Sequence, residues 1–223
     1  MNTLLFFVTV IATFGGVVLV SRLFGKEGLF AWIGMAVVVA NVLVCKCVDL
    51  FGLSATLGNV LFGSVFLVTD ILTENYGVET AKKAVWVGVA SEVCSLVLIQ
   101  IALMFTPNAL DTMQGSMQTV FGLFPRTTIA SITMFILSNQ LDIFLFEKLR
   151  EKTNGKYLWL RNNLATSLSQ CIENWLFYII AFYGLYSMSD IAVMTLTCCL
   201  IEVIVAVLDT PFVYLAVRKV KQS

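Results

Sequence analysis

Apolar residues run along this chain in blocks long enough to cross a lipid bilayer, which takes about 20 residues of helix. The blocks predict seven spans, near residues 3–21, 28–46, 56–74, 83–105, 127–147, 162–186 and 191–215. Four residues interrupt the third span: Gly58, Asn59, Gly63 and Ser64. That span is either a short or a broken helix, so the count is six or seven. The pattern predicts an all-α integral membrane protein with one transmembrane domain over residues 1–223.

The composition agrees with a membrane location. Hydrophobic residues make up 59% of the chain and charged residues 13%, against about 45–50% and about 25% in an ordinary soluble domain. The mean hydropathy is +0.91. The lipid bilayer is therefore the expected surroundings of most of the surface.

The basic residues predict an orientation. Twelve of the fourteen would fall on one side of a seven-span bundle: Arg22, Lys26, Lys82, Lys83, Lys148, Arg150, Lys152, Lys156, Arg161, Arg218, Lys219 and Lys221. The other side would carry only Lys46 and Arg126. Because Lys- and Arg-rich loops stay in the cytoplasm, we expect the N-terminus outside and the C-terminus in the cytoplasm.

The sequence does not support several classes of function. No basic face with interleaved aromatic residues suggests nucleic-acid binding. The chain has six Cys and no His, and neither Cys45–Cys47 nor Cys198–Cys199 has the spacing of a structural zinc site. No phosphate-binding loop or nucleophile elbow is present. We expect neither an enzyme, nor a bound metal, nor a cofactor.

Acidic residues inside the apolar spans carry the functional signal. Seven fall within the spans or at their edges: Asp70, Glu74, Glu92, Asp142, Glu173, Glu202 and Asp209. A charged side chain near the bilayer centre costs about 2.5–3.5 kcal/mol on insertion scales. Such residues are kept where they face a cavity, bind a ligand or stay protonated, and structural pairing does not readily explain seven acids with so few basic neighbours.

Two of these acids lie in an internal echo, SNQLDIFLF at residues 138–146 and SQCIENWLF at 169–177. Each copy places an amide three positions before a carboxylate, so the two share a helix face. The pairs are Asn139 with Asp142, and Gln170 with Glu173. The predicted topology makes the two helices antiparallel, and transporters often bind substrate where such inverted repeats meet.

The two copies do not match in depth. Glu173 lies twelve residues beyond Arg161, about 18 Å along a helix, whereas Asp142 lies six residues before Lys148, about 9 Å. The two carboxylates lie at the same depth in the membrane only if a helix is broken, tilted or extended beyond the membrane. The alternative, polar contacts that only hold two helices together, stays open.

A second polar group lies in TDILTENYG, at the end of the third span. Asp70 and Glu74 share one helix face there. Lys82, Lys83 or Arg161 would neutralise them from the cytoplasmic side. Both a gate and a simple surface ion pair are consistent with this pattern.

Three stretches resemble one bacterial family: FGSVFLVTDILTENYG followed by AKKAVWVG, then SNQLDIFLFEKLREKTNGKYLWLRNN, then TSLSQCIENWLFYIIAFYG. They are similar to the YhhQ-like queuosine precursor transporters, also described as vitamin uptake proteins, over about residues 50–215. The resemblance implies uptake of 7-deazaguanines (preQ0, preQ1 or queuine) for tRNA modification, across the bacterial cytoplasmic (inner) membrane. It also implies kinship in fold with the substrate-binding subunits of energy-coupling-factor transporters.

A 7-deazaguanine suits the polar residues of the echo. Its ring N1–H and exocyclic amine are adjacent donors that one carboxylate accepts, and bonds to a charged partner are about twice as strong as neutral ones. The expected substrate-binding residues are Asn139, Asp142, Phe144, Gln170, Glu173, Asn174, Trp175 and Phe177, with the two acids as walls of one cavity. The expected gating or proton-coupling residues are Asp70, Glu74, Arg161 and Glu202. The second copy ends in Asp-Thr in the family and in Glu173-Asn174 here, which bears on substrate choice.

Three mechanisms remain open. The first and favoured one is a self-sufficient secondary transporter, with proton coupling through Asp70, Glu74 or Glu202 as one option for its energy source. The second is a binding subunit of an energy-coupling-factor transporter that needs a separate ATPase module. The third is a structural membrane protein whose acids only join helices. The apolar surface permits a homodimer without requiring one.

Overall fold

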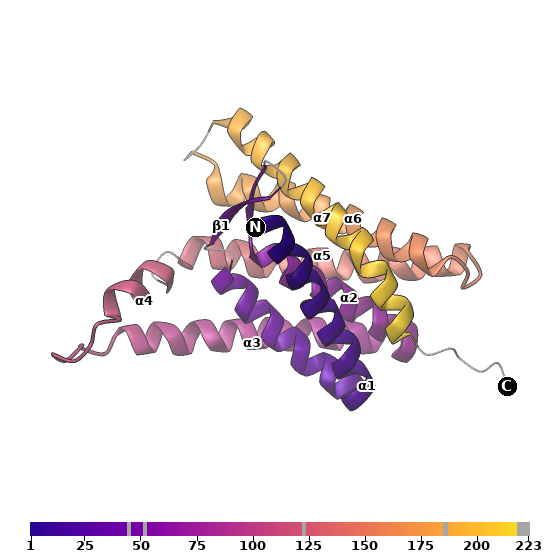
Figure 1. Ribbon diagram of the computed structural model, residues 1–223, viewed down its shortest axis with the longest axis horizontal. Helices are drawn as coiled ribbons and strands as arrows, with labels where there is room; N and C mark the ends of the chain where they lie inside the picture. The colour runs from indigo at the N-terminus through magenta and orange to yellow at the C-terminus, as the bar shows by residue number, and fades with distance from the viewer. Residues whose placement is uncertain (44–45, 51–52, 122–123, 185–186, 218–223) are drawn as a thin grey trace.

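The computed structural model describes residues 1–43, 46–50, 53–121, 124–184 and 187–217. Helices make up most of these ranges (Figure 1). The elements are α1 (Asn2–Leu43), β1 (Cys47–Leu50), β2 (Leu53–Thr56), α2 (Gly58–Tyr76), α3 (Val78–Leu103), α4 (Gln114–Phe121), α5 (Phe124–Lys152), α6 (Leu158–Phe182) and α7 (Met188–Ala216). Helices α1, α3 and α7 are long and apolar enough to cross a membrane by length and composition. The expected all-α class is confirmed, apart from one short hairpin.

Helix α1 is a pair of antiparallel arms that reverse at Gly25. This residue has φ +61° and ψ −138°, a conformation that L-residues with a side chain rarely adopt. A Cβ placed on Gly16 would lie 2.6 Å from the Trp32 ring, although sixteen residues of straight helix would separate the two by about 24 Å. The arms thus lie side by side (Figure 1), and they correspond to the first two expected spans. The second was expected to reach residue 46; α1 ends at Leu43, and residues 44–45 lie outside the described ranges.

Helix α2 is the centre of the bundle. Every residue from 63 to 73 is buried, and the helix contacts α1, α3, α5, α6 and α7. The chain then turns through one residue, Gly77 with φ +87°, and continues at once as α3. The third span is therefore a continuous helix of 19 residues, enclosed by protein on all sides over its middle turns.

Most of the basic residues that the structure describes gather at one end of the bundle. At this end Arg22 Nη2 donates to the Leu215 carbonyl at 3.0 Å, and Asn75 Nδ2 donates to the Ala216 carbonyl at 3.2 Å. The Trp159 N–H donates to the Tyr214 hydroxyl at 3.2 Å. The turn of α1, the end of α2, the start of α6 and the end of α7 thus meet on the same side.

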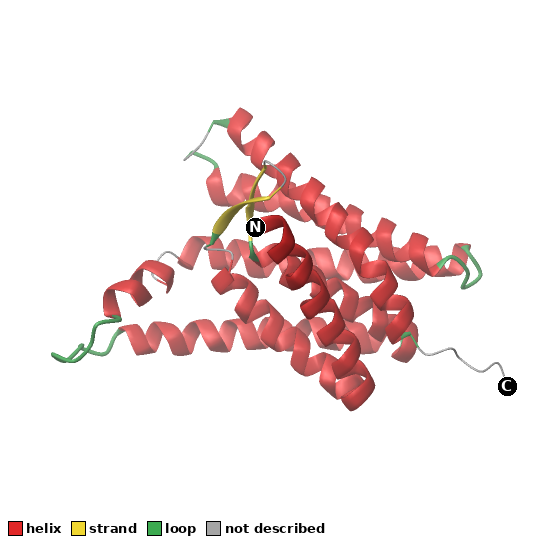
Figure 2. Cartoon of the chain, viewed as in Figure 1, coloured by secondary structure: helices red, strands yellow, loops and turns green. Residues whose placement is uncertain are grey.

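The opposite end carries the hairpin and α4. Strands β1 and β2 pair antiparallel, with Leu50 opposite Leu53; they are the yellow arrows in Figure 2. The Asp111 carboxylate accepts the N–H groups of Met113 and Gln114 and so caps the start of α4. Gln100 Nε2 of α3 donates to the Phe121 carbonyl at 2.8 Å, which ties α4 back to α3. The sequence patterns predicted neither of these two elements.

Candidate functional site

The two copies of the echo lie face to face on α5 and α6. The Asp142 Oδ1 atom accepts from the Thr166 hydroxyl at 3.1 Å and from the Ser169 hydroxyl at 3.4 Å. One turn away, the Ser138 hydroxyl meets the Glu173 carboxylate. Lower numbers on α5 therefore pair with higher numbers on α6, so the helices are antiparallel. Asp142 and Glu173 lie at different levels of this seam, about one helical turn apart.

Asp142 belongs to an aspartate cluster, which consists of Asp70, Asp142 and Asp209. All three side chains are buried, and the Asp70 carboxyl interacts electrostatically with the other two. The Asp209 Oδ1 atom accepts from Asn162 Nδ2 at 2.6 Å. Neither Asp70 oxygen accepts a hydrogen bond from a donor group in the described part of the chain. Helices α2, α5 and α7 each contribute one carboxyl group to this cluster.

An ion pair closes the seam at the basic end. Arg161 Nη2 of α6 lies 2.6 Å from Glu74 Oε2 of α2, and Arg150 Nε lies 3.9 Å from the same oxygen. The Arg161 guanidinium also lies over the Phe146 ring, 5.1 Å from its centre. Arg161 is the largest fully buried side chain described, with 1% of its surface exposed. Of the three basic residues expected to neutralise Glu74, the structure places Arg161 there, while Lys82 pairs with Glu79.

Glu173 belongs to a glutamate cluster, which consists of Glu92, Glu173 and Glu202. Glu173 interacts electrostatically with the other two. Glu202 accepts a short hydrogen bond from Asn174 Nδ2, and Glu92 Oε1 accepts from Asn41 Nδ2 at 2.8 Å. Helices α3, α6 and α7 carry the acids, and the second arm of α1 carries Asn41.

Buried oxygens without a hydrogen-bond donor lie in this cluster and beside it. Glu173 Oε2 has no hydrogen-bond partner in the described ranges, and the same is true of the amide oxygens of Gln170 and Asn139. Gln170 is 2% exposed and Asn139 is fully buried. The Cys198 thiol lies 3.6 Å from Glu202 Oε1 and 3.5 Å from Asn174 Oδ1. The arrangement is suited to a ligand that brings several N–H groups.

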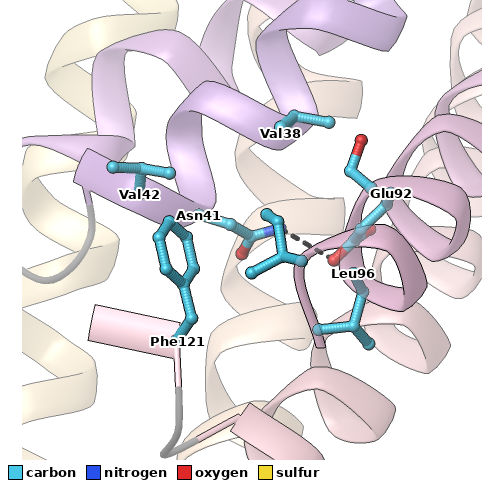
Figure 3. A pocket seen from close by; sticks show the side chains of 8 residues that line it. Val38, Asn41, Val42, Glu92, Leu96 and Phe121 are labelled. Atoms are coloured by element: carbon cyan, nitrogen blue, oxygen red, sulfur yellow. Dashed lines mark hydrogen bonds between the residues drawn. The ribbon is translucent and has the colours of Figure 1, made fainter. Parts of the chain in front are cut away.

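A cavity of about 40 Å³ adjoins Glu92. Figure 3 shows the Asn41–Glu92 hydrogen bond in its wall, with Val38, Val42 and Leu96 around it and Phe121 of α4 beside Asn41. This volume is large enough for water and is well below the roughly 300–1,000 Å³ of a pocket for a small organic ligand. Helices must move apart for such a ligand to enter here.

Comparison with known proteins identifies the family. Residues 56–216 match the family model described as "Putative vitamin uptake transporter". The chain belongs to this transporter family. A Bacillus subtilis protein named "Probable queuosine precursor transporter" is 39% identical over 198 residues, which is 88% of this chain and 86% of the relative. A Haemophilus influenzae protein of the same name is 27% identical over 134 residues, which is 60% of this chain and 54% of the relative. No solved structure matches.

Membership of a transporter family rules out an enzyme and identifies the bundle as a membrane protein. The family region begins at Thr56, at the end of β2, and covers α2 to α7. It therefore includes both acid clusters and the Arg161–Glu74 pair. Asn41 on α1, which donates to Glu92, lies outside it, as do Val38 and Val42 of the cavity wall.

The structure brings together some of the residues that the sequence grouped, and separates others. Asp142 and Glu173, expected as walls of one cavity, lie in different clusters. Glu202, expected in gating or coupling, lies beside Asn174 and Glu173 in the glutamate cluster.

Two of the three expected aromatic residues face outward. Phe144 is 52% exposed and lies under Lys148 Nζ, and Trp175 is 38% exposed. Phe177 packs edge to face on Tyr178, with ring centres 5.7 Å apart, and the Tyr178 hydroxyl contacts Cys198. Of the three aromatic residues, Phe177 is therefore the one connected to the glutamate cluster, through Tyr178 and Cys198.

Several residues of the two clusters were not assigned to a site from the sequence. Glu92 and Asp209 carried a signal, since each is an acid inside an apolar span without a basic neighbour in the sequence. Asn41 and Thr166 carried none, because single amides and hydroxyls are common in membrane helices. Their roles depend on which helices pack together.

Proposed function

We propose that this transporter imports 7-deazaguanine precursors of queuosine for tRNA modification, as a secondary transporter. Two relatives are named probable queuosine precursor transporters. The family membership supports transport in general, and the buried donors and acceptors described above support a flat, hydrogen-bonding substrate.

The proposed topology has seven membrane segments, with the two arms of α1 counted separately and α2 as the enclosed segment. The N-terminus is outside and the C-terminus is in the cytoplasm. The gathering of basic residues at one end of the bundle supports this orientation, because cationic loops are retained in the cytoplasm.

The substrate site in this proposal is the glutamate cluster. Glu173 Oε2 carries the argument, since it is a buried carboxylate oxygen without a partner in the described part of the chain. Glu173 accepts the ring N1–H and the exocyclic amine of the base. Gln170, Asn139 and Asn174 supply amides for the carbonyl and ring nitrogens, and Phe177 supplies an aromatic surface near one wall.

The cytoplasmic gate in this proposal is the Arg161–Glu74 pair. It joins α6 to α2 across the path from the glutamate cluster to the basic end of the bundle. The aspartate cluster, one turn deeper, holds the proton that drives the cycle. Two facing carboxyls in a low-dielectric site do not both stay ionised, so Asp70 and Asp142 together are suited to hold one proton.

Uptake in a queuosine-deficient bacterium tests this function. The host neither makes nor imports deazaguanines and lacks any energy-coupling-factor module. We expect saturable uptake of labelled deazaguanine by the wild-type chain, loss of uptake with Glu173→Gln, and normal uptake with the exposed control Glu79→Gln. Binding without uptake would favour the subunit that needs a separate ATPase module, and neither binding nor uptake by a well-expressed chain would refute the proposal.

A further inference from the structure

The two acid clusters differ in their charge balance. Arg161 interacts electrostatically with Asp70, so the aspartate cluster has a cation beside it. The glutamate cluster has none among the described side chains: no recorded ion pair includes Glu92, Glu173 or Glu202. Their partners are amide, hydroxyl and thiol groups, which carry no charge.

In the described part of the chain, the glutamate cluster has no cation beside it, and nearby buried amide oxygens have no hydrogen-bond donor. The α5–α6 pairing that sets Ser138 opposite Glu173 and Asp142 opposite Ser169 also sets Asn139 and Gln170 near each other, between the two clusters. Neither amide oxygen has a hydrogen-bond partner among the residues that the structure describes, and only 2% of Gln170 is exposed. Burying unpaired acceptors is costly, so these oxygens point to a ligand that donates hydrogen bonds. The acids without a cation beside them point to a ligand that carries positive charge.

Glu92 is placed to receive such a charge. Its carboxylate accepts one hydrogen bond from Asn41, borders the cavity shown in Figure 3 and interacts with Glu173 across the cluster. Glu202 is more fully occupied, because Asn174 and Cys198 both contact its carboxylate. If Glu173 holds the donor edge of the base, Glu92 is the acid with a cavity beside it for a substituent.

We propose that Glu92 makes this transporter selective for cationic deazaguanines, so that a substrate with a protonated 7-aminomethyl group is imported in preference to the same ring with a neutral 7-nitrile. An alkylammonium group remains charged at neutral pH, since such amines titrate near pH 10.4. It offers three donors to the acceptors of the cluster. This inference rests on the proposed function and specifies which substrates that function takes.

The test is competitive uptake of the aminomethyl and nitrile compounds, each labelled, in cells that express wild type, Glu92→Gln or Glu79→Gln. A charged hydrogen bond is worth about 1.5–3 kcal/mol, so we expect a preference for the amine of about tenfold or more in wild type. Glu92→Gln keeps the shape and the Asn41 contact. It should bring the ratio close to one by lowering uptake of the amine more than uptake of the nitrile, and Glu79→Gln should leave the ratio and both uptake rates unchanged.

Each alternative outcome has a separate meaning. Equal uptake of both compounds by wild type would overturn the charge preference and leave the proposed function intact. A preference that survives Glu92→Gln unchanged would overturn the assignment of Glu92. Uptake of neither compound by a well-expressed chain would refute the proposed function, and this inference with it. Loss of both compounds in Glu92→Gln alone would show that Glu92 serves transport in general and would overturn its selective role.

Discussion

Arg161 of α6 and Glu74 of α2 form an ion pair with 2.6 Å between Nη2 and Oε2, in a place where the arginine side chain is 1% exposed and the glutamate 17%. The Phe146 ring shields the guanidinium on one side. This pair joins the central helix to one half of the echo. A charge enclosed in this way depends on its partner, because water is not available to replace it.

Arg161→Ala is therefore expected to destabilise the protein. Removing one partner of a buried ion pair costs about 3–5 kcal/mol, since the other charge is left uncompensated. Unfolding in mixed micelles would measure this loss, with the exposed Lys156→Ala as a matched control. The double variant Arg161→Ala with Glu74→Ala should recover part of the loss. Equal stabilities for Arg161→Ala and Lys156→Ala would contradict the importance of the pair.

Asp70→Asn is expected to separate stability from transport. The Asp70 side chain is 1% exposed and its oxygens accept no hydrogen bond in the described ranges, so replacing one carboxyl of the Asp70–Asp142 pair with a neutral amide lowers the cost of burying the pair. The melting temperature should stay the same or rise, while proton-driven uptake is lost. The exposed Asp49→Asn should change neither property. Full uptake by Asp70→Asn would exclude this residue from coupling.

The hydropathy pattern located the helices well but ranked the central one lowest. Helix α2 has a weak apolar signal because Gly63, Ser64 and Asp70 lie in it, yet all three are buried. A helix enclosed by other helices does not face lipid and so needs no continuous apolar surface. A segment of weak hydropathy in a membrane protein is therefore either a helix at the centre of the bundle or a loop, and only the packing distinguishes the two.

The sequence predicts which residues of the candidate site share a face of one helix, but not which of these faces meet in the folded bundle. The helical spacing that pairs Asn139 with Asp142 is local and can be read from the sequence, and the antiparallel seam follows from the basic loops. Which acids meet across helices is not local. Glu92 comes near Glu173 because α3 packs against α5, which in turn packs against α6, and no spacing along the chain encodes that arrangement.

Gly25→Ala is expected to weaken the reversal of α1. The backbone at Gly25 has φ +61° and ψ −138°, and holding a residue with a side chain in such a region costs about 1–3 kcal/mol. Gly15→Ala is the matched control, because an added Cβ there meets nothing within 4 Å and alanine favours a helix by up to about 1 kcal/mol over glycine. Micelle unfolding of both variants should show opposite signs; a loss of equal size in both would argue against a strained turn.

The orientation of the bundle can be checked with single cysteines at Asn108 and Gly155, introduced into a chain whose native cysteines are replaced. Both positions are exposed. Asn108 lies in the loop between α3 and α4, and Gly155 lies in the turn between α5 and α6. The basic turn is expected in the cytoplasm. An impermeant thiol reagent should label Asn108→Cys in intact cells and Gly155→Cys only after the membrane is permeabilised.

Labelling in the reverse order would invert the topology. Labelling of both in intact cells would mean that α5 does not cross the membrane, because this helix alone, apart from the short α4, separates the two positions along the chain.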